Sequence, residues 1–254
     1  MRPFLAGPLP LLMAHRGGAA YGPNVGIENT LRAFGTAVEF GYRFLETDVR
    51  ASRDGVPVAV HDDRLDRLCG VPDRVRDLDW DRLARLRVGG REPLARLDQL
   101  LEAFPDARFN IDVKSDDAVL PTVRAVQRAA ACDRVCLATF SDRRVRRIRA
   151  LAGPRVVTSC SRGEVALLRL GPSRWFRATG ARAGAVCLQV PWRTRGVTVV
   201  TPRFVHQAHE LGLQVHVWTV DGMAEAAEML TLGADGLIID RVDRLAPLLH
   251  GDRA

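Results

Sequence analysis

The feature that most constrains the fold is a regular alternation of short apolar runs and amphipathic segments in the second half of the chain. Alternation of this kind is typical of parallel βαβ units. The expected strands are 108–113, 134–139, 155–158, 185–189, 214–219 and 236–239. The expected helices are 118–131, 142–151, 164–170, 203–211, 223–232 and 242–249.

Two further apolar runs, 11–14 and 44–49, bring the number of expected strands to eight. Because (β/α)8 barrels run to about 250 residues as one domain, we expect an α/β fold, a TIM barrel that occupies the whole chain, 1–254. An open doubly wound sheet is the alternative. It is less favoured because the first βα loop lacks GxGxxG and the chain has no P-loop.

The first half of the chain departs from simple alternation after its second strand. Residues 62–96 are rich in arginine and aspartate, and we expect them to form a small elaboration on a loop rather than a separate domain. The other elements expected here are a helix over 31–40 capped by Asn29-Thr30, an accessory strand over 57–60, an amphipathic helix over 80–88 and a helix over 97–104.

Glu46 and Asp48 lie two residues apart in the apolar run of the second strand. Successive side chains on a strand point to opposite faces, so these two carboxylates share one face. Two neighbouring acids on a mostly apolar strand repel each other and lose hydration. A hard metal ion is the simplest compensating cation.

Further polar residues stand at the carboxyl ends of other expected strands, where the active sites of barrels lie. Lys114 is notable because it is the only lysine among 37 basic residues. A compact ammonium differs chemically from the planar guanidinium that this chain uses elsewhere, which favours a functional role. The strand-end residues are His15 and Arg16, His61, Asp112 and Lys114, and Trp218.

The residue types at these ends indicate metal-assisted cleavage of a phosphate ester. Three carboxylates, Glu46, Asp48 and Asp112, without a cysteine ligand favour one Mg²⁺ or Ca²⁺ ion over zinc. An arginine and a lysine beside the metal suit a phosphoryl group. His15 and His61 would supply a general acid and a general base near neutral pH.

The charge and cysteine content narrow the class of partner and the compartment. The formal net charge is +7, but the chain has no basic tail, zinc finger or aromatic-interleaved basic strand, so we expect no nucleic-acid partner. The five scattered cysteines form no CxxC pair, which favours a reducing compartment and a cytoplasmic protein. No apolar run approaches the length of a transmembrane helix.

Several motifs follow one another along the chain: His15-Arg16-Gly17, Glu28-Asn29-Thr30, Glu46-Thr47-Asp48-Val49, Asp54-Gly55-Val56-Pro57-Val58, His61-Asp62, Asp112-Val113-Lys114, Trp218-Thr219-Val220-Asp221 and Gly233-Ala234-Asp235-Gly236-Leu237-Ile238. Together, over about residues 11–245, they resemble the motifs of glycerophosphodiester phosphodiesterases. The resemblance implies a TIM barrel that hydrolyses glycerophosphodiesters to an alcohol and glycerol 3-phosphate, with a divalent metal at the three acids. It implies that Arg16 and Lys114 hold the phosphate and that Asn29 and Trp218 border the substrate pocket.

Two positions depart from the family pattern. The family usually has Glu where Asp112 stands, and its Pro-Glu-Asn-Thr begins here with Ile27. The alternatives are a lysophospholipase D that uses the same site, with an interfacial patch of Trp175-Phe176 and Trp192, and a barrel-fold binding protein without turnover. A third is a phosphatidylinositol-type phospholipase that releases a cyclic phosphate. Head-group specificity and oligomeric state stay open.

Overall fold

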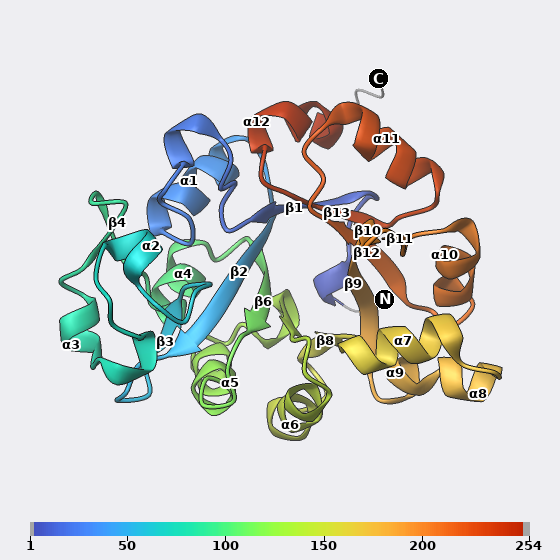
Figure 1. Ribbon diagram of the computed structural model, residues 1–254, viewed down its shortest axis with the longest axis horizontal. Coiled ribbons are helices and arrows are strands. Elements are labelled where there is room, and N and C mark those ends of the chain that lie inside the picture. The colour runs from blue at the N-terminus through green and yellow to red at the C-terminus, as the bar shows by residue number, and fades with distance from the viewer. Residues whose placement is uncertain (1–2, 251–254) are drawn as a thin grey trace.

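The computed structural model describes residues 3–250; residues 1, 2 and 251–254 of the expected 1–254 domain lie outside this range. Eight parallel strands form a closed barrel with helices packed around it (Figure 1), which confirms the expected TIM barrel. The strands are β1 (Leu11–His15), β2 (Phe44–Ala51), β6 (Arg108–Val113), β7 (Val135–Ala138), β8 (Val157–Ser159), β9 (Ala185–Pro191), β12 (Gln214–Trp218) and β13 (Gly236–Ile239).

The helices follow the strands in the expected order, and several begin at a residue that caps them. Thr30 accepts a hydrogen bond from the Ala33 amide, and Thr201 does the same for Phe204, followed by Pro202 in the first turn. The helices are α1 (Leu31–Glu39), α4 (Leu97–Ala103), α5 (Val119–Arg128), α6 (Asp142–Ala152), α7 (Arg162–Leu170), α8 (Arg174–Arg177), α9 (Thr179–Arg182), α10 (Pro202–His209), α11 (Met223–Thr231) and α12 (Val242–Leu245).

The register of the barrel places the sequence-predicted polar residues in neighbouring rows. β1 pairs with β13 on one side and with β2 on the other, which closes the barrel. His15 lies opposite Glu46, and Asp48 lies opposite Asp112 on β6. Because strands in parallel register point equivalent side chains to the same side, these residues converge at the carboxyl end of the barrel.

The expected accessory strand is β3 (Pro57–Ala59), which extends β2 in antiparallel pairing. The elaboration that follows, 62–96, folds over its own apolar cluster and lies to one side of the barrel, at the left in Figure 1. It contains α2 (Asp66–Cys69), α3 (Trp80–Leu83) and a hairpin of β4 (Arg87–Val88) and β5 (Glu92–Pro93).

The helix expected over 80–88 is wrong in length, because α3 ends at Leu83. Leu83 and Val88 are both buried in the same cluster. Five residues along a helix correspond to a rotation of about 140°, so a continuous helix could not bury both. The chain instead turns through Gly89 and Gly90, whose positive φ angles of 58° and 70° are accessible to glycine, and forms the hairpin.

Two apolar layers support the barrel. One lies between the strands and the surrounding helices, and the other fills the bottom of the barrel, where the N-terminal turn (Pro3–Leu5) inserts Phe4 and Leu5. All five cysteines are free. Among residues 3–250, no helix is both long and apolar enough to cross a bilayer.

Candidate active site

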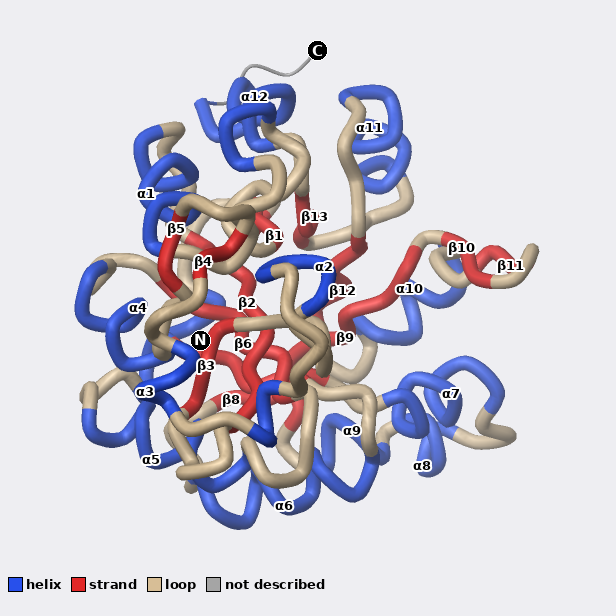
Figure 2. The backbone as a smooth tube through the Cα atoms, turned by 60° about the vertical axis from the view of Figure 1, so that its left-hand side comes forward, coloured by secondary structure: helices blue, strands red, loops and turns tan. Residues whose placement is uncertain are grey.

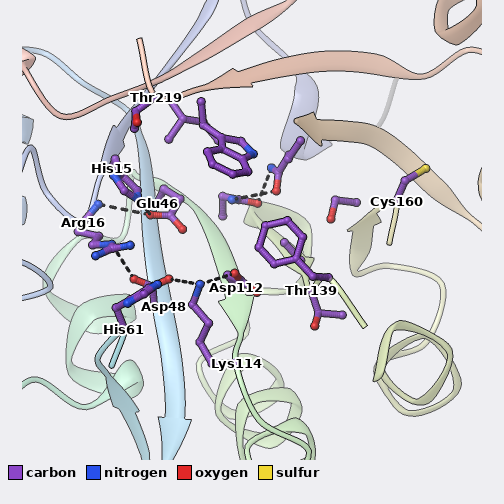
Figure 3. Close-up of a pocket in the computed structure, with 17 residues that line it drawn as sticks. His15, Arg16, Glu46, Asp48, His61, Asp112, Lys114, Thr139, Cys160 and Thr219 are labelled. Carbon is purple, nitrogen blue, oxygen red and sulfur yellow. Dashed lines mark hydrogen bonds and ion pairs between the residues drawn. The ribbon is translucent and has the colours of Figure 1, made fainter. Parts of the chain in front are cut away.

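A pocket of about 320 Å³ opens at the carboxyl end of the barrel. Most of the sequence-predicted residues line it, and Figure 3 shows the charged residues and the two histidines among them converging on one wall. The predicted residues on its wall are His15, Arg16, Glu46, Asp48, His61, Asp112, Lys114 and Trp218.

Lys114 lies between two of the three buried carboxylates. Its ammonium is 2.8 Å from Oδ1 of Asp48 and 2.6 Å from Oδ2 of Asp112 (Figure 3). Asp48 is also approached by Arg16, whose Nε lies 3.0 Å from Oδ2. Protein cations therefore compensate Asp48 and Asp112 directly, whereas the sequence suggested carboxylates without such partners.

The pKa values of these groups follow from burial and from their neighbours. Burial and the charge of Asp48 raise the pKa of Glu46 to about 7. Burial also raises the pKa of Asp112, although Lys114 opposes the shift. For Asp48, burial is outweighed by Lys114 and Arg16, which hold its pKa below the usual value. Burial and the neighbouring Asp48 thus favour the neutral form of Glu46, whereas two protein cations favour the ionised form of Asp48.

His15 is held by a carboxylate that the sequence analysis missed. Its Nδ1 lies 2.9 Å from Oδ1 of Asp240, and its Nε2 lies 3.7 Å from Oε2 of Glu46. Burial opposes the charged imidazolium, but Glu46 and Asp240 outweigh it and raise the pKa of His15. Asp240 directly follows β13, so its position at a strand end was a signal that could have identified it.

His61 has a similar arrangement. Its Nδ1 lies 2.7 Å from Oδ1 of Asp62, and Asp62 in turn binds Arg67 on α2 at 2.6 Å. Arg67 also binds Glu28, which accepts a hydrogen bond from Arg16 at 3.0 Å. A continuous chain of charged contacts therefore connects the elaboration to the charged wall of the pocket.

Asn29 supports the site from behind rather than bordering the pocket as expected. Its side-chain amide donates to Oδ2 of Asp48 at 3.2 Å, and its carbonyl oxygen accepts from Thr47 at 2.8 Å. Asn29 has a φ of 60°, a left-handed conformation that asparagine tolerates better than most residues. Both polar ends of the side chain are occupied, so it orients Asp48.

The rest of the pocket wall is neutral and begins beside the charged residues, since Asn110 pairs with Glu46 across neighbouring strands. Asn110 and Gln189 exchange two amide hydrogen bonds, of 3.3 and 2.8 Å. The ring of Trp218 packs edge-to-face on Phe140 with a centroid distance of 6.1 Å. The pocket can therefore hold an anionic group at one wall and a polar, uncharged group at the other.

Comparisons with known proteins agree with this geometry. The family model for the glycerophosphoryl diester phosphodiesterase family matches residues 15–244. The Probable glycerophosphodiester phosphodiesterase 2 of Mycobacterium tuberculosis is 40% identical over 248 residues, which cover 94% of this chain and 90% of that protein. The chain belongs to the glycerophosphoryl diester phosphodiesterase family.

Solved structures of similar fold include two phosphodiesterases. A glycerophosphodiester phosphodiesterase from Parabacteroides distasonis matches with a TM-score of 0.79 at 23% identity, covering 98% of this chain and 100% of that one. A phosphodiesterase from Oleispira antarctica, solved with the product sn-glycerol-3-phosphate, matches with a TM-score of 0.75 at 20% identity, covering 95% and 97%. At 23% and 20% identity, these two structures support the fold of this chain alone.

The carboxylates at the pocket of this phosphodiesterase could hold a hard divalent ion. Within residues 3–250, no three His, Cys, Asp or Glu side chains form a ready cluster for a metal. Yet Glu46, Asp48 and Asp112 all border one pocket, and an ammonium already lies between two of them. Carboxylate oxygens suit Mg²⁺ or Ca²⁺. A second cation would relieve the charge that raises the pKa of Glu46.

Proposed function

We propose that this protein hydrolyses glycerophosphodiesters to an alcohol and glycerol 3-phosphate, with His15 and His61 as the acid–base pair. The observation that carries the proposal is that a carboxylate holds Nδ1 of each histidine, Asp240 for His15 and Asp62 for His61. Both imidazoles also line the charged pocket. Each therefore has a fixed Nδ1 and an Nε2 available for proton transfer.

The other residues have complementary roles in the proposal. Arg16 and Lys114 bind the phosphodiester anion as charge-assisted donors. One histidine removes the proton of the attacking hydroxyl, and the other protonates the leaving alkoxide. Glu46, Asp48 and Asp112 would hold one divalent ion, which supplies a Lewis acid to the phosphoryl group when bound. The neutral wall with Trp218 would receive an uncharged part of the substrate.

Lys114 has two successive partners in this proposal. Without a metal it neutralises Asp48 and Asp112; a divalent ion held by these carboxylates would neutralise them instead and would leave the ammonium for the phosphate. Free cysteines throughout the chain support a reducing compartment such as the cytoplasm as the place of the reaction.

The test is product analysis of a panel of glycerophosphodiesters and lysophospholipids, with and without chelator. We expect glycerol 3-phosphate from a soluble diester, and loss of turnover on chelation with recovery after Mg²⁺ or Ca²⁺ is restored. His15→Ala should lose turnover, whereas His206→Ala, an exposed histidine on α10, should not. Release of a cyclic phosphate, exclusive turnover of lysophospholipids, or full turnover of metal-free protein would contradict the proposal.

A further inference from the structure

An exposed apolar corner lies on the outer surface of the barrel, where α7 meets α8. In both views α7 and α8 lie side by side at the periphery, away from the elaboration (Figures 1 and 2). Leu170 and Trp175 are 76% and 62% exposed, unusually high for side chains of this size. We call this corner the α7–α8 patch; its members are Leu167, Leu170, Trp175 and Phe176.

The patch is held in place by its own contacts. Trp175 packs edge-to-face on Phe176 with a centroid distance of 5.1 Å, and Arg182 lies 5.0 Å from the Trp175 ring. Arg174 donates to the carbonyl oxygen of Glu210 at the end of α10. The aromatic rings therefore protrude from an anchored segment.

The chain's net charge is concentrated around this patch. The sequence has 37 basic and 30 acidic residues, and seven of the basic residues but none of the acidic ones lie between positions 165 and 209. The rest of the chain is therefore balanced, with 30 basic against 30 acidic residues. A general preference for arginine does not explain this, because in the rest of the chain basic and acidic residues are equal in number. The seven are Arg169, Arg174, Arg177, Arg182, Arg193, Arg195 and Arg203.

These arginines are available to an external anion. Within residues 3–250, their described partners are carbonyl oxygens and aromatic rings, not carboxylates. Arg169 donates to the carbonyl oxygens of Thr198 and Val199 at 2.9 and 2.8 Å, which ties α7 to the hairpin of β10 (Arg193–Thr194) and β11 (Val197–Thr198). The hairpin adds another exposed apolar residue, Val197.

We propose that the α7–α8 patch and its arginines dock the protein on the surface of an anionic lipid bilayer. Exposed tryptophan and leucine side chains insert at the boundary between headgroups and acyl chains. The arginines pair with lipid phosphates, and their aliphatic parts cover apolar surface. A second copy of the chain is a poor occupant, because it would bring the same positive charge. This docking is independent of the reaction at the barrel mouth.

The test is cosedimentation of the full chain with vesicles of phosphatidylcholine alone and of an equimolar mixture with phosphatidylglycerol. We expect binding to the mixed vesicles alone, with a blue shift of tryptophan emission that Trp175→Ala removes. The Trp175→Ala change should weaken binding at least about tenfold, because apolar area no longer leaves water. Val25→Ala, an exposed apolar residue outside the patch, should bind as the unaltered protein does.

The charges are tested with matched pairs of arginines. Arg174→Gln with Arg182→Gln should weaken binding about 25-fold, since each arginine near an anionic surface contributes about fivefold, or about 1 kcal/mol. Arg124→Gln with Arg146→Gln, exposed arginines on α5 and α6, should weaken it far less. Circular dichroism and turnover of a soluble diester verify folding.

Three outcomes would overturn the proposal. The first is no binding to either vesicle, and the second is equal weakening by both arginine pairs. The third is binding of an RNA or an acidic protein through these residues without binding of vesicles.

Discussion

Removing the ammonium of Lys114 should destabilise the metal-free protein. In Lys114→Met the apolar stem is approximately kept, but Asp48 and Asp112 lose a partner at 2.8 and 2.6 Å. Breaking a buried ion pair by removing one partner costs about 3–5 kcal/mol. Asp48 keeps Arg16 at 3.0 Å, so most of the loss falls on Asp112. We expect a decrease of about 3 kcal/mol in the free energy of unfolding near neutral pH.

The loss should depend on pH in a direction set by Asp112. Burial already raises the pKa of this carboxyl, and Lys114 opposes the shift. Without the ammonium, the folded-state pKa rises further above the unfolded value. The added cost is present while Asp112 is ionised and disappears as pH falls through the folded-state pKa. The variant should therefore be closer to the unaltered protein at about pH 5 than at about pH 7.

Urea unfolding with chelator present, followed by circular dichroism at both pH values, measures the two effects. The matched control is Arg155→Met, which breaks the exposed pair of Arg155 with Asp133; exposed pairs contribute about 0–1 kcal/mol. A loss for Lys114→Met no larger than the control's, or one independent of pH, would refute the reasoning that Lys114 is the internal counter-ion of these carboxylates.

The remaining predictions concern metal, phosphate, protons and a helix cap. Mg²⁺ or Ca²⁺ should raise the melting temperature, and Asp48→Asn should abolish the rise while the protein stays folded; an unchanged rise would contradict the assigned ligand. Lys114→Arg should lose most turnover despite its charge, because a bulkier guanidinium fork cannot take the place of a compact ammonium beside the metal and the phosphate; kinetics like those of the unaltered protein would make the single lysine a coincidence. His15→Ala and His61→Ala should differ in turnover. One variant should turn over a natural diester about 10²–10⁴-fold more slowly yet recover with a nitrophenyl ester, whereas the other should be slow with both substrates. Equal loss of turnover in both variants on both substrates would exclude this division of roles. Thr30→Ala should lower the free energy of unfolding by about 1 kcal/mol in urea titration, and no change would show that the cap of α1 is dispensable.

Most of the barrel was predictable because its strands are apolar runs of a few residues between amphipathic segments. The same reasoning failed for 80–88, where the periodicity of a helix was inferred locally. The burial of Leu83 and Val88 in one cluster depends on the fold of the whole elaboration, which no local pattern contains. In short segments the hydrophobic periodicity covers too few residues to distinguish a helix from other structures, so tertiary contacts determine the secondary structure.

In the site, contacts between residues close in the sequence could be predicted, whereas contacts between distant residues could not. Glu46 and Asp48 share a strand, so their common face follows from backbone geometry. Asp240 lies 225 residues from the histidine that it holds, and only closure of β1 against β13 brings them together. The hydrogen bond from Asn29 to Asp48 depends on a left-handed backbone conformation at Asn29, which cannot be predicted from the sequence pattern.

The pairing of His15 with Asp240 also has a consequence during synthesis. The histidine leaves the ribosome 225 residues before its partner, because Asp240 belongs to the segment after the last strand. Until β13 docks on β1, the nascent chain has neither a closed barrel nor an oriented imidazole. Long-range contacts of this kind form late and slowly. The first and last strands of the barrel must meet before any single molecule can turn over substrate.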